Sequence, residues 1–296
     1  MSPQLLETIL KKAKSESPID FVGLYNWTEP LLHPQIGELI NIVNSFGLRC
    51  LISSNLNISK RLEDVIKAQP AFFRVSLSGF TNHIYQQQHR GGDVERVKEN
   101  MRLLADLVRK YNSKTHIEIY YLRWLGNLDE EFFMQEFAEN LGFTFKAEWA
   151  WMCPIEKQIA ILSNDESGYS DEDILTVNSL ARPFLETVNF LMTKYANSGC
   201  PYIHGVLTLD CTGRVSLCCG TFNQELYTIG NYLDYTLSEL NSMKLKNDNC
   251  KAICNVCTGL GLPALGFVND PELNNLPVLY VLERYAKKMG TSLASI

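Results

Sequence analysis

The sequence predicts an α/β fold of parallel βα units, and two observations lead to this prediction. Short apolar runs alternate with amphipathic segments through the first two-thirds of the chain, the order typical of βαβ units joined by right-handed crossovers. The runs are apolar at consecutive positions, as expected for strands that helices bury. With 296 residues, 46% of them hydrophobic, the chain is long enough for one large core or two domains.

The helical pattern begins at the N-terminus. Residues 3–16 place Leu6, Ile9 and Ala13 on one helical face, and Pro3 is a typical helix start. Further helices are expected over residues 35–46, 62–68, 81–88, 94–111 and 129–141. Strands are expected over residues 19–25, 48–54, 72–78, 115–122 and 143–151.

The order of these elements indicates an incomplete barrel. Five strands are too few for a (βα)₈ barrel and enough for most of a partial one. The chain also opens on a helix, so the first strand of such a fold is expected to be missing.

The second half of the chain has a different pattern. From about residue 155 the strand signal stops, residues 163–168 suit a linker, and a helix is expected over 172–196. The segments VLTLD and RVSLC flank a predicted hairpin turn, with helices expected over 236–246 and 271–289. The predicted organisation is a partial βα barrel (1–160), a linker with a helix (161–199), a cysteine-rich domain (200–262) and a helical tail (263–296).

Composition excludes several classes of protein. A net charge of −6 argues against a general nucleic-acid binder. No apolar run is long enough to span a membrane, and the N-terminus lacks the features of a signal peptide, so we expect a cytoplasmic location without membrane or nucleic-acid partners.

Cysteines are concentrated in one part of the chain. Seven of the nine lie between Cys200 and Cys257, a density that favours metal ligands over disulfides in a reducing compartment. We assign Cys200, Cys218, Cys254 and Cys257 to one site, because Cys254 and Cys257 form a C-x₂-C pair and the predicted hairpin carries Cys218. Four thiolates suit either a [4Fe–4S] cluster or a tetrahedral zinc ion, and spacing alone does not separate the two.

The remaining cysteines receive weaker predictions. Cys219 and Cys250, and less strongly Cys211, are alternatives to the four assigned ligands. Cys50 and Cys153 stand alone on apolar segments and are predicted to be core residues. The five histidines show no metal-ligand spacing and are interpreted as non-ligands.

Polar side chains follow three consecutive predicted strands. They are Glu29, Ser54, Asn55, Ser76 and Ser78. Because parallel strands place their carboxyl ends on one rim, a carboxylate, hydroxyls and an amide are expected to meet there and to suit a zwitterionic, ribose-bearing ligand. Each residue also has an ordinary interpretation as a turn or cap residue. Arg90, beside Gly91 and Gly92, suits either a ligand carboxylate or an acidic side chain.

These motifs resemble segments of radical S-adenosylmethionine (SAM) enzymes. The stretch from Leu24 to Pro34, which contains Thr28-Glu29-Pro30, resembles their "GEP-L-HP" segment. Ser53-Ser54-Asn55 is similar to their "TNG" strand end, and Ser76-Leu77-Ser78-Gly79, followed by Tyr85 and Arg90, to their "S-D-G…Y…R-G" stretch. Cys200 to Cys218, with Gly213, is similar to the opening of the SPASM and twitch extensions, and the single later C-x₂-C looks more like a twitch domain with one auxiliary cluster.

The resemblance implies a partial (βα)₆ barrel with a cluster extension. It also implies that Glu29 contacts the SAM amino group, that Ser54, Asn55, Ser76 and Ser78 lie near its ribose and methionine parts, and that Arg90 lies near its carboxylate. An intact enzyme of this kind cleaves SAM to a 5′-deoxyadenosyl radical, which takes hydrogen from a substrate. The implied partners are a peptide or small-molecule substrate and an electron donor of the reductase or flavodoxin type.

Two departures from the family pattern stand out. Thr28 replaces the usual glycine before the Glu, and the C-x₃-C-x₂-C motif that holds the SAM-cleaving cluster is absent. The simplest hypothesis is a truncated gene product whose missing segment supplies this second [4Fe–4S] cluster, and the chain as given is not expected to cleave SAM. The alternatives are a non-catalytic scaffold or partner subunit, and a protein with a structural zinc knuckle.

Overall fold

The computed structural model describes residues 1–277 and 280, and these residues fall into two compact units. The first unit spans Met1–Glu148 and the second begins at Trp149. None of the helices in the described ranges has the length and apolar character needed to cross a bilayer.

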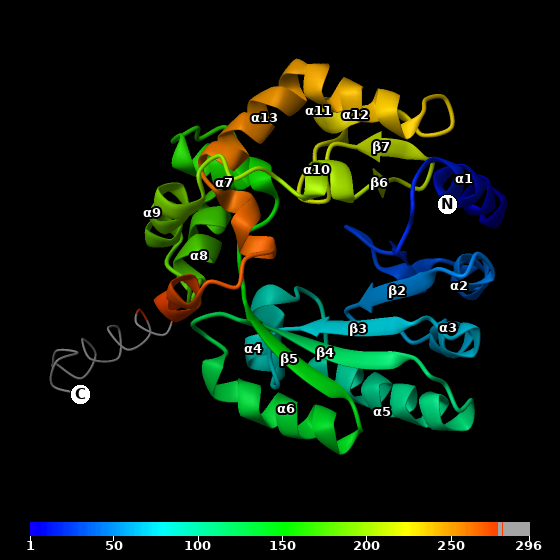
Figure 1. The fold of residues 1–296 in the computed structure, drawn as a ribbon. Coiled ribbons are helices and arrows are strands. Elements are labelled where there is room, and N and C mark those ends of the chain that lie inside the picture. The colour runs from blue at the N-terminus through cyan, green and yellow to red at the C-terminus, as the bar shows by residue number, and fades with distance from the viewer. Residues whose placement is uncertain (278–279, 281–296) are drawn as a thin grey trace, which may run out of the picture. The chain divides into compact units, whose positions relative to one another are not determined.

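The first unit is a parallel sheet with helices between its strands (Figure 1). Its strands lie in the order β1-β2-β3-β4-β5, and β1 to β4 pair in parallel. The strands are β1 (Phe21–Gly23), β2 (Arg49–Ser54), β3 (Phe72–Leu77), β4 (His116–Arg123) and β5 (Thr144–Trp149). The helices are α1 (Pro3–Glu16), η1 (Pro30–Leu32), α2 (Ile36–Ser45), α3 (Leu62–Ala68), α4 (Asn82–Gln88), α5 (Val94–Lys110), η2 (Leu128–Glu130) and α6 (Glu131–Asn140). The predicted α/β fold class is therefore confirmed, and each strand lies within two residues of its predicted start.

The core of this unit lies between the sheet and its helices. Alternate strand residues such as Ile52, Val75 and Ile119 are fully buried against apolar faces of α2, α3 and α5. The residues between them on β3 and β4 face the other side of the sheet. There Arg74 of β3 forms an ion pair, at 2.8 Å, with Glu118, the residue opposite it on β4. Burial is complete on the helix-covered face only, because a sheet side chain changes face with every residue.

The second unit combines helices with a small antiparallel sheet of order β6-β7-β8. The strands are β6 (Thr208–Leu209), β7 (Arg214–Ser216) and β8 (Thr228–Asn231). The helices are α7 (Ile155–Leu162), α8 (Asp171–Ser179), α9 (Phe184–Tyr195), α10 (Tyr202–Gly205), α11 (Gln224–Tyr227), α12 (Leu237–Lys246), α13 (Asp248–Gly259) and η3 (Leu262–Gly266). The predicted hairpin and the helix over 236–246 are confirmed.

Three sequence predictions in this unit need correction. Residues 155–162, predicted as loop, form α7. The single helix predicted over 172–196 is two helices, because Pro183 disfavours helical backbone in the residues before it. Residues 248–259 form α13, a helix that the sequence did not predict. Residues 271–277 are helical, and the rest of the predicted tail helix lies outside the described residues.

Candidate functional site

Polar residues of the first unit gather where its parallel strands end. Glu29 caps η1 with its side chain, which accepts a hydrogen bond from the backbone N–H of Leu31 at 3.0 Å. The other carboxylate oxygen of Glu29 accepts from the backbone N–H of Asn55 at 3.0 Å. The structure therefore joins the loop after β1 to the end of β2, as the sequence predicted for a shared rim.

The two residues at the end of β2 use their side chains locally. Ser54 is buried, and its hydroxyl accepts from the backbone N–H of Leu56 at 2.9 Å. The side-chain carbonyl of Asn55 accepts from the backbone N–H of Asn57 at 3.0 Å. Both interactions shape the turn that leaves the strand, which agrees with the ordinary turn interpretation and keeps the Asn55 backbone next to Glu29.

The end of β3 is organised around a half-buried histidine, His89. Ser78 is buried, and its hydroxyl lies 3.3 Å from Nε2 of His89. The His89 ring stacks on Tyr85 with 4.3 Å between ring centroids, and burial lowers the pKa of His89 to about 4. His89 is therefore neutral at pH 7, so this part of the rim has no positive charge from the imidazole. Ser76 is half-buried on β3, on the face that carries Arg74.

Asn57 is a residue of this site that sequence reasoning missed. Its amide N–H donates to the hydroxyl of Tyr85 at 2.7 Å, and its carbonyl accepts from the backbone N–H of Asp93 at 2.9 Å. Asn57 therefore joins the turn after β2 to helix α4 and to the start of α5. The Asn-x-Asn spacing with Asn55 was the available signal, since Asn side chains commonly bond to backbone groups in turns.

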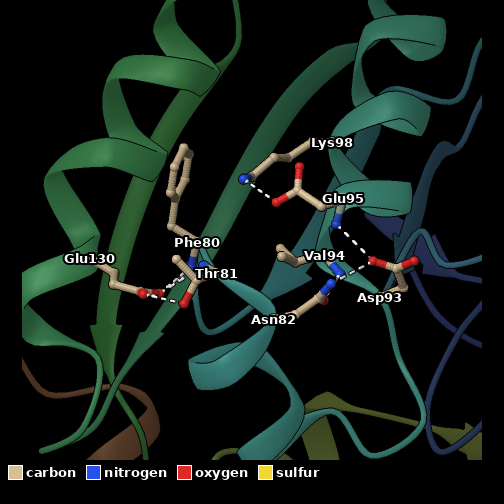
Figure 2. A network of polar contacts seen from close by, with 8 residues as sticks. All are labelled: Phe80, Thr81, Asn82, Asp93, Val94, Glu95, Lys98 and Glu130. Carbon is tan, nitrogen blue, oxygen red and sulfur yellow. Dashed lines mark hydrogen bonds and ion pairs between the residues drawn. The ribbon is translucent and has the colours of Figure 1, made fainter.

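The loop after β3 is held by a second polar network (Figure 2). The carboxylate of Glu130 accepts from the backbone N–H groups of Phe80 at 2.6 Å and Thr81 at 3.0 Å. Asn82 then donates to the carboxylate of Asp93 at 2.9 Å and accepts from the backbone N–H of Val94 at 2.7 Å. These contacts fix the N-terminal end of α4 and join it to the start of α5; the exposed Arg90 lies between the two helices.

A cysteine-lined cavity is the main feature of the second unit. It has a volume of about 190 Å³ and an almost wholly apolar lining. Its lining includes all four predicted ligands, Cys200, Cys218, Cys254 and Cys257. They come from three places in the chain: the segment before α10, the turn after β7, and helix α13.

Helix α13 explains the C-x₂-C spacing. Residues three apart on a helix lie on the same face, so Cys254 and Cys257 both face the cavity. Asn247 caps the start of the helix, and its side chain accepts from the backbone N–H of Cys250 at 3.0 Å. Cys250 itself is buried in a small apolar cluster with Leu217 and is not among the cavity-lining residues.

The four sulfur atoms influence one another. Burial first, and then the neighbouring sulfurs of Cys200, Cys218 and Cys254, raise the pKa of Cys257 to about 12. Burial also raises the pKa of Cys254 to about 11, with further increases from Cys218 and Cys200. Several thiolates in an apolar space are costly without a cation, so bound metal is the condition under which all four would deprotonate.

A buried lysine lies close to these sulfurs. Only 2% of Lys244 is exposed, and its ammonium donates to the backbone carbonyl of Ile203, a cavity residue, at 3.2 Å. Burial lowers the pKa of Lys244, and the charges of Cys218 and Cys254 oppose that shift. Thiolates at Cys218 and Cys254 would therefore favour the charged form of Lys244.

The other cysteines differ in their positions. Cys50 is fully buried in the first core, as predicted. The prediction of a core position for Cys153 is wrong, because Cys153 is exposed and lines the cavity. Cys219 also lines the cavity, whereas Cys211 is exposed and is not among the lining residues.

Comparisons with known proteins show similarity in fold. No protein-family model matches the chain, and no curated protein sequence matches it. Streptococcus suis SuiB, solved with bound S-adenosylmethionine, shares 12% identity with a TM-score of 0.51, over 95% of this chain and 65% of SuiB. The enzyme anSMEcpe with bound AdoMet gives 14% identity and a TM-score of 0.49, over 86% of this chain and 74% of that one.

SuiB and anSMEcpe are radical SAM enzymes. With a TM-score above 0.5, SuiB shares its fold with this chain, a partial βα barrel, and the chain spans about two thirds of the length of SuiB.

Proposed function

We propose that this chain is a radical SAM-type protein whose second unit holds one auxiliary [4Fe–4S] cluster on Cys200, Cys218, Cys254 and Cys257. The observation that carries the proposal is the cavity lined by all four thiols, which come from distant parts of the sequence. A bound cluster would add electron transfer or a coordination site for substrate, and Cys thiolates are its usual ligands.

The cavity supports a cluster better than a single zinc ion. A structural zinc ion draws four ligand atoms to one point, with sulfur about 2.3 Å from the metal. Here a cavity of about 190 Å³ separates the thiols, and in the described part of the chain no three Cys, His, Asp or Glu groups are placed to hold one ion. A four-iron cluster fills such a space and reaches sulfurs that lie farther apart. This set of residues fits the cluster.

For the first unit we propose SAM binding at the strand-end rim. Each carboxylate oxygen of Glu29 accepts one backbone hydrogen bond, which leaves lone pairs for the SAM ammonium. Asn55, Ser76 and Ser78 would lie near the ribose and methionine parts, and Arg90 near the carboxylate. Ser54 would help indirectly by holding the shape of the turn after β2, because its hydroxyl already accepts a hydrogen bond from the backbone N–H of Leu56.

The proposed chemistry of these 296 residues ends at binding SAM and one cluster. Reductive cleavage of SAM needs a second cluster on a three-cysteine motif, and that motif is not in the sequence. A longer protein that supplied it would abstract hydrogen from a peptide or small molecule, with an electron donor of the reductase or flavodoxin type. The same missing motif supports the second candidate, a non-catalytic scaffold or partner subunit.

Iron and sulfide analysis tests the cluster. After anaerobic preparation we expect about four iron and four sulfide per chain, as four thiolate ligands imply. Replacing both Cys254 and Cys257 by Ala should remove the iron, whereas Cys211→Ala, a change at an exposed cysteine outside the cavity lining, should retain it. One zinc per chain without sulfide would refute the cluster and support the zinc knuckle. Equilibrium dialysis with labelled SAM tests the rim separately.

A further inference from the structure

Two cysteines that the proposed cluster does not use also line the cavity. Cys153 and Cys219 are both exposed residues, whereas Cys257 is buried and Cys200, Cys218 and Cys254 are partly buried. They therefore lie on the solvent-accessible side of the same space.

A backbone hydrogen bond holds the two segments together. The N–H of Ile155 donates to the carbonyl of Gly220 at 3.0 Å. Cys153 lies two residues before the donor and Cys219 one residue before the acceptor. A Cβ atom on Gly220 would lie 2.8 Å from Cδ1 of Ile155, so the Ile155 side chain packs closely on the turn that carries Cys219.

The carboxylate of Glu156 adds hydrogen bonds between the same two segments. One oxygen of Glu156 accepts from the backbone N–H groups of Phe222 at 2.7 Å and Asn223 at 3.0 Å. The segments 153–156 and 219–223 are thus joined at successive positions by three hydrogen bonds. This arrangement fixes Cys153 next to the turn that carries Cys219.

The electrostatics agree with this proximity. Desolvation raises the pKa of the Cys153 thiol, and the largest contribution after desolvation comes from the sulfur of Cys219. This ordering agrees with the hydrogen bonds that join the two segments.

We propose that Cys153 and Cys219 are a redox-active dithiol, which a small-molecule disulfide converts reversibly into a Cys153–Cys219 disulfide. In the first step one cysteine sulfur attacks the small disulfide, forms a mixed disulfide and releases one small thiol. In the second step the other cysteine sulfur attacks the mixed disulfide, the intramolecular bond forms, and a second small thiol leaves. Two protein thiols are oxidised and one small disulfide is reduced to two thiols, which carry away both protons.

The bond would tie the turn that carries Cys218 to the segment before α7. Since Cys218 directly precedes Cys219, the bridge would restrain one proposed cluster ligand and restrict entry to the cavity. The dithiol does not depend on the cluster, because neither cysteine is among its four proposed ligands.

Mass spectrometry of the full chain tests the proposal. The protein is incubated anaerobically with oxidised glutathione, its remaining thiols are alkylated, and it is digested with trypsin. We expect a cross-linked pair that joins the peptide of Cys153 to the peptide of Cys219, and dithiothreitol should remove it. Cys218 shares its tryptic peptide with Cys219, so the variant Cys219→Ser assigns the bond.

Both single variants and a control complete the design. In Cys219→Ser, Cys153 should carry glutathione in place of the cross-link, and Cys153→Ser should have the same effect on Cys219. Cys211→Ser, a change at an exposed cysteine outside the cavity lining, should leave the cross-link intact. Alkylation of both cysteines without any bridge would overturn the proposal, as would a bridge from Cys219 to Cys200 or one that persists in Cys219→Ser.

Iron and sulfide measured on the same samples separate this inference from the proposed cluster. A bridge between Cys153 and Cys219 in a chain without iron supports the dithiol and contradicts the cluster. Iron and sulfide at about four per chain without a bridge would support the cluster and contradict the dithiol.

Discussion

The carboxylate of Glu29 accepts a hydrogen bond from the backbone N–H of Asn55 at 3.0 Å. This contact joins the loop after β1 to the end of β2, between two residues that are 26 positions apart in the sequence. It also means that the side chain proposed to bind the SAM ammonium already has a structural role. The two roles can be separated by experiment.

Replacing Glu29 by Gln removes the charge and one acceptor oxygen. We expect the free energy of unfolding of the first unit to fall by about 1–3 kcal/mol, the range for a lost hydrogen bond to a charged group. Hydrogen exchange at the amides of Leu31 and Asn55 measures the effect locally. Glu99→Gln, a change at an exposed position of α5, is the matched control and should leave both amides protected. Unchanged exchange in Glu29→Gln would contradict the structural role.

The lowered pKa of His89 should make the stability of the first unit depend on pH. Burial lowers its pKa from 6.5 to about 4 in the folded chain. Between these values the unfolded chain binds a proton that the folded chain does not. The stabilisation that is complete above pH 6.5 is therefore lost as the pH falls toward 4, by up to about 3 kcal/mol.

Urea unfolding of the first unit between pH 7.5 and 4.5 measures this loss. The variant His89→Gln should show a flatter pH profile than the original chain, whereas His83→Gln, at an exposed position of the helix that ends just before His89, should not. Parallel profiles for the original chain and His89→Gln would refute the assignment.

The close packing of Gly79 against helix α4 leaves no room for a side chain after β3. A Cβ atom at this position would lie 2.8 Å from the backbone nitrogen of Tyr85 and 2.9 Å from its Cα. Because Tyr85 is fully buried, Gly79→Ala must displace helix α4 and is expected to destabilise the first unit by about 1–3 kcal/mol. Thermal unfolding followed by circular dichroism measures the change. Gly205→Ala adds a methyl group with nothing within 4 Å, and an equal loss in that variant would argue against the constraint.

The buried Lys244 should affect the midpoint potential of the proposed cluster. Its buried ammonium stabilises the more negative, reduced form, so Lys244→Met should lower the midpoint potential by on the order of 50–100 mV. Redox titration followed by electron paramagnetic resonance gives this value. Lys246→Met changes an exposed lysine on the same helix and should shift the potential much less. Equal shifts in the two variants would show that the burial of Lys244 is unimportant.

The strands and helices of the first unit were predictable because their signals are local. The run around Ile52 and the helical spacing of Leu6, Ile9 and Ala13 each specify one element without reference to the rest of the chain. The second unit was less predictable. Three residues of α13 are buried, and two of them are Cys250 and Cys257. Both were interpreted as possible metal ligands, so they were not counted as the apolar face of a helix.

The sequence by itself determined the α/β class and the order of the strands, and it predicted one site for Cys200, Cys218, Cys254 and Cys257 with Cys219 and Cys250 as alternatives. These follow from hydrophobic period and motif spacing, which are properties of neighbouring residues. Only the tertiary structure decided that Glu29 bonds to Asn55, that Asn57 joins three segments, and that Cys153 lies beside the cavity rather than in the core. Each of these contacts joins residues far apart in the chain, and their pairing depends on how whole elements pack.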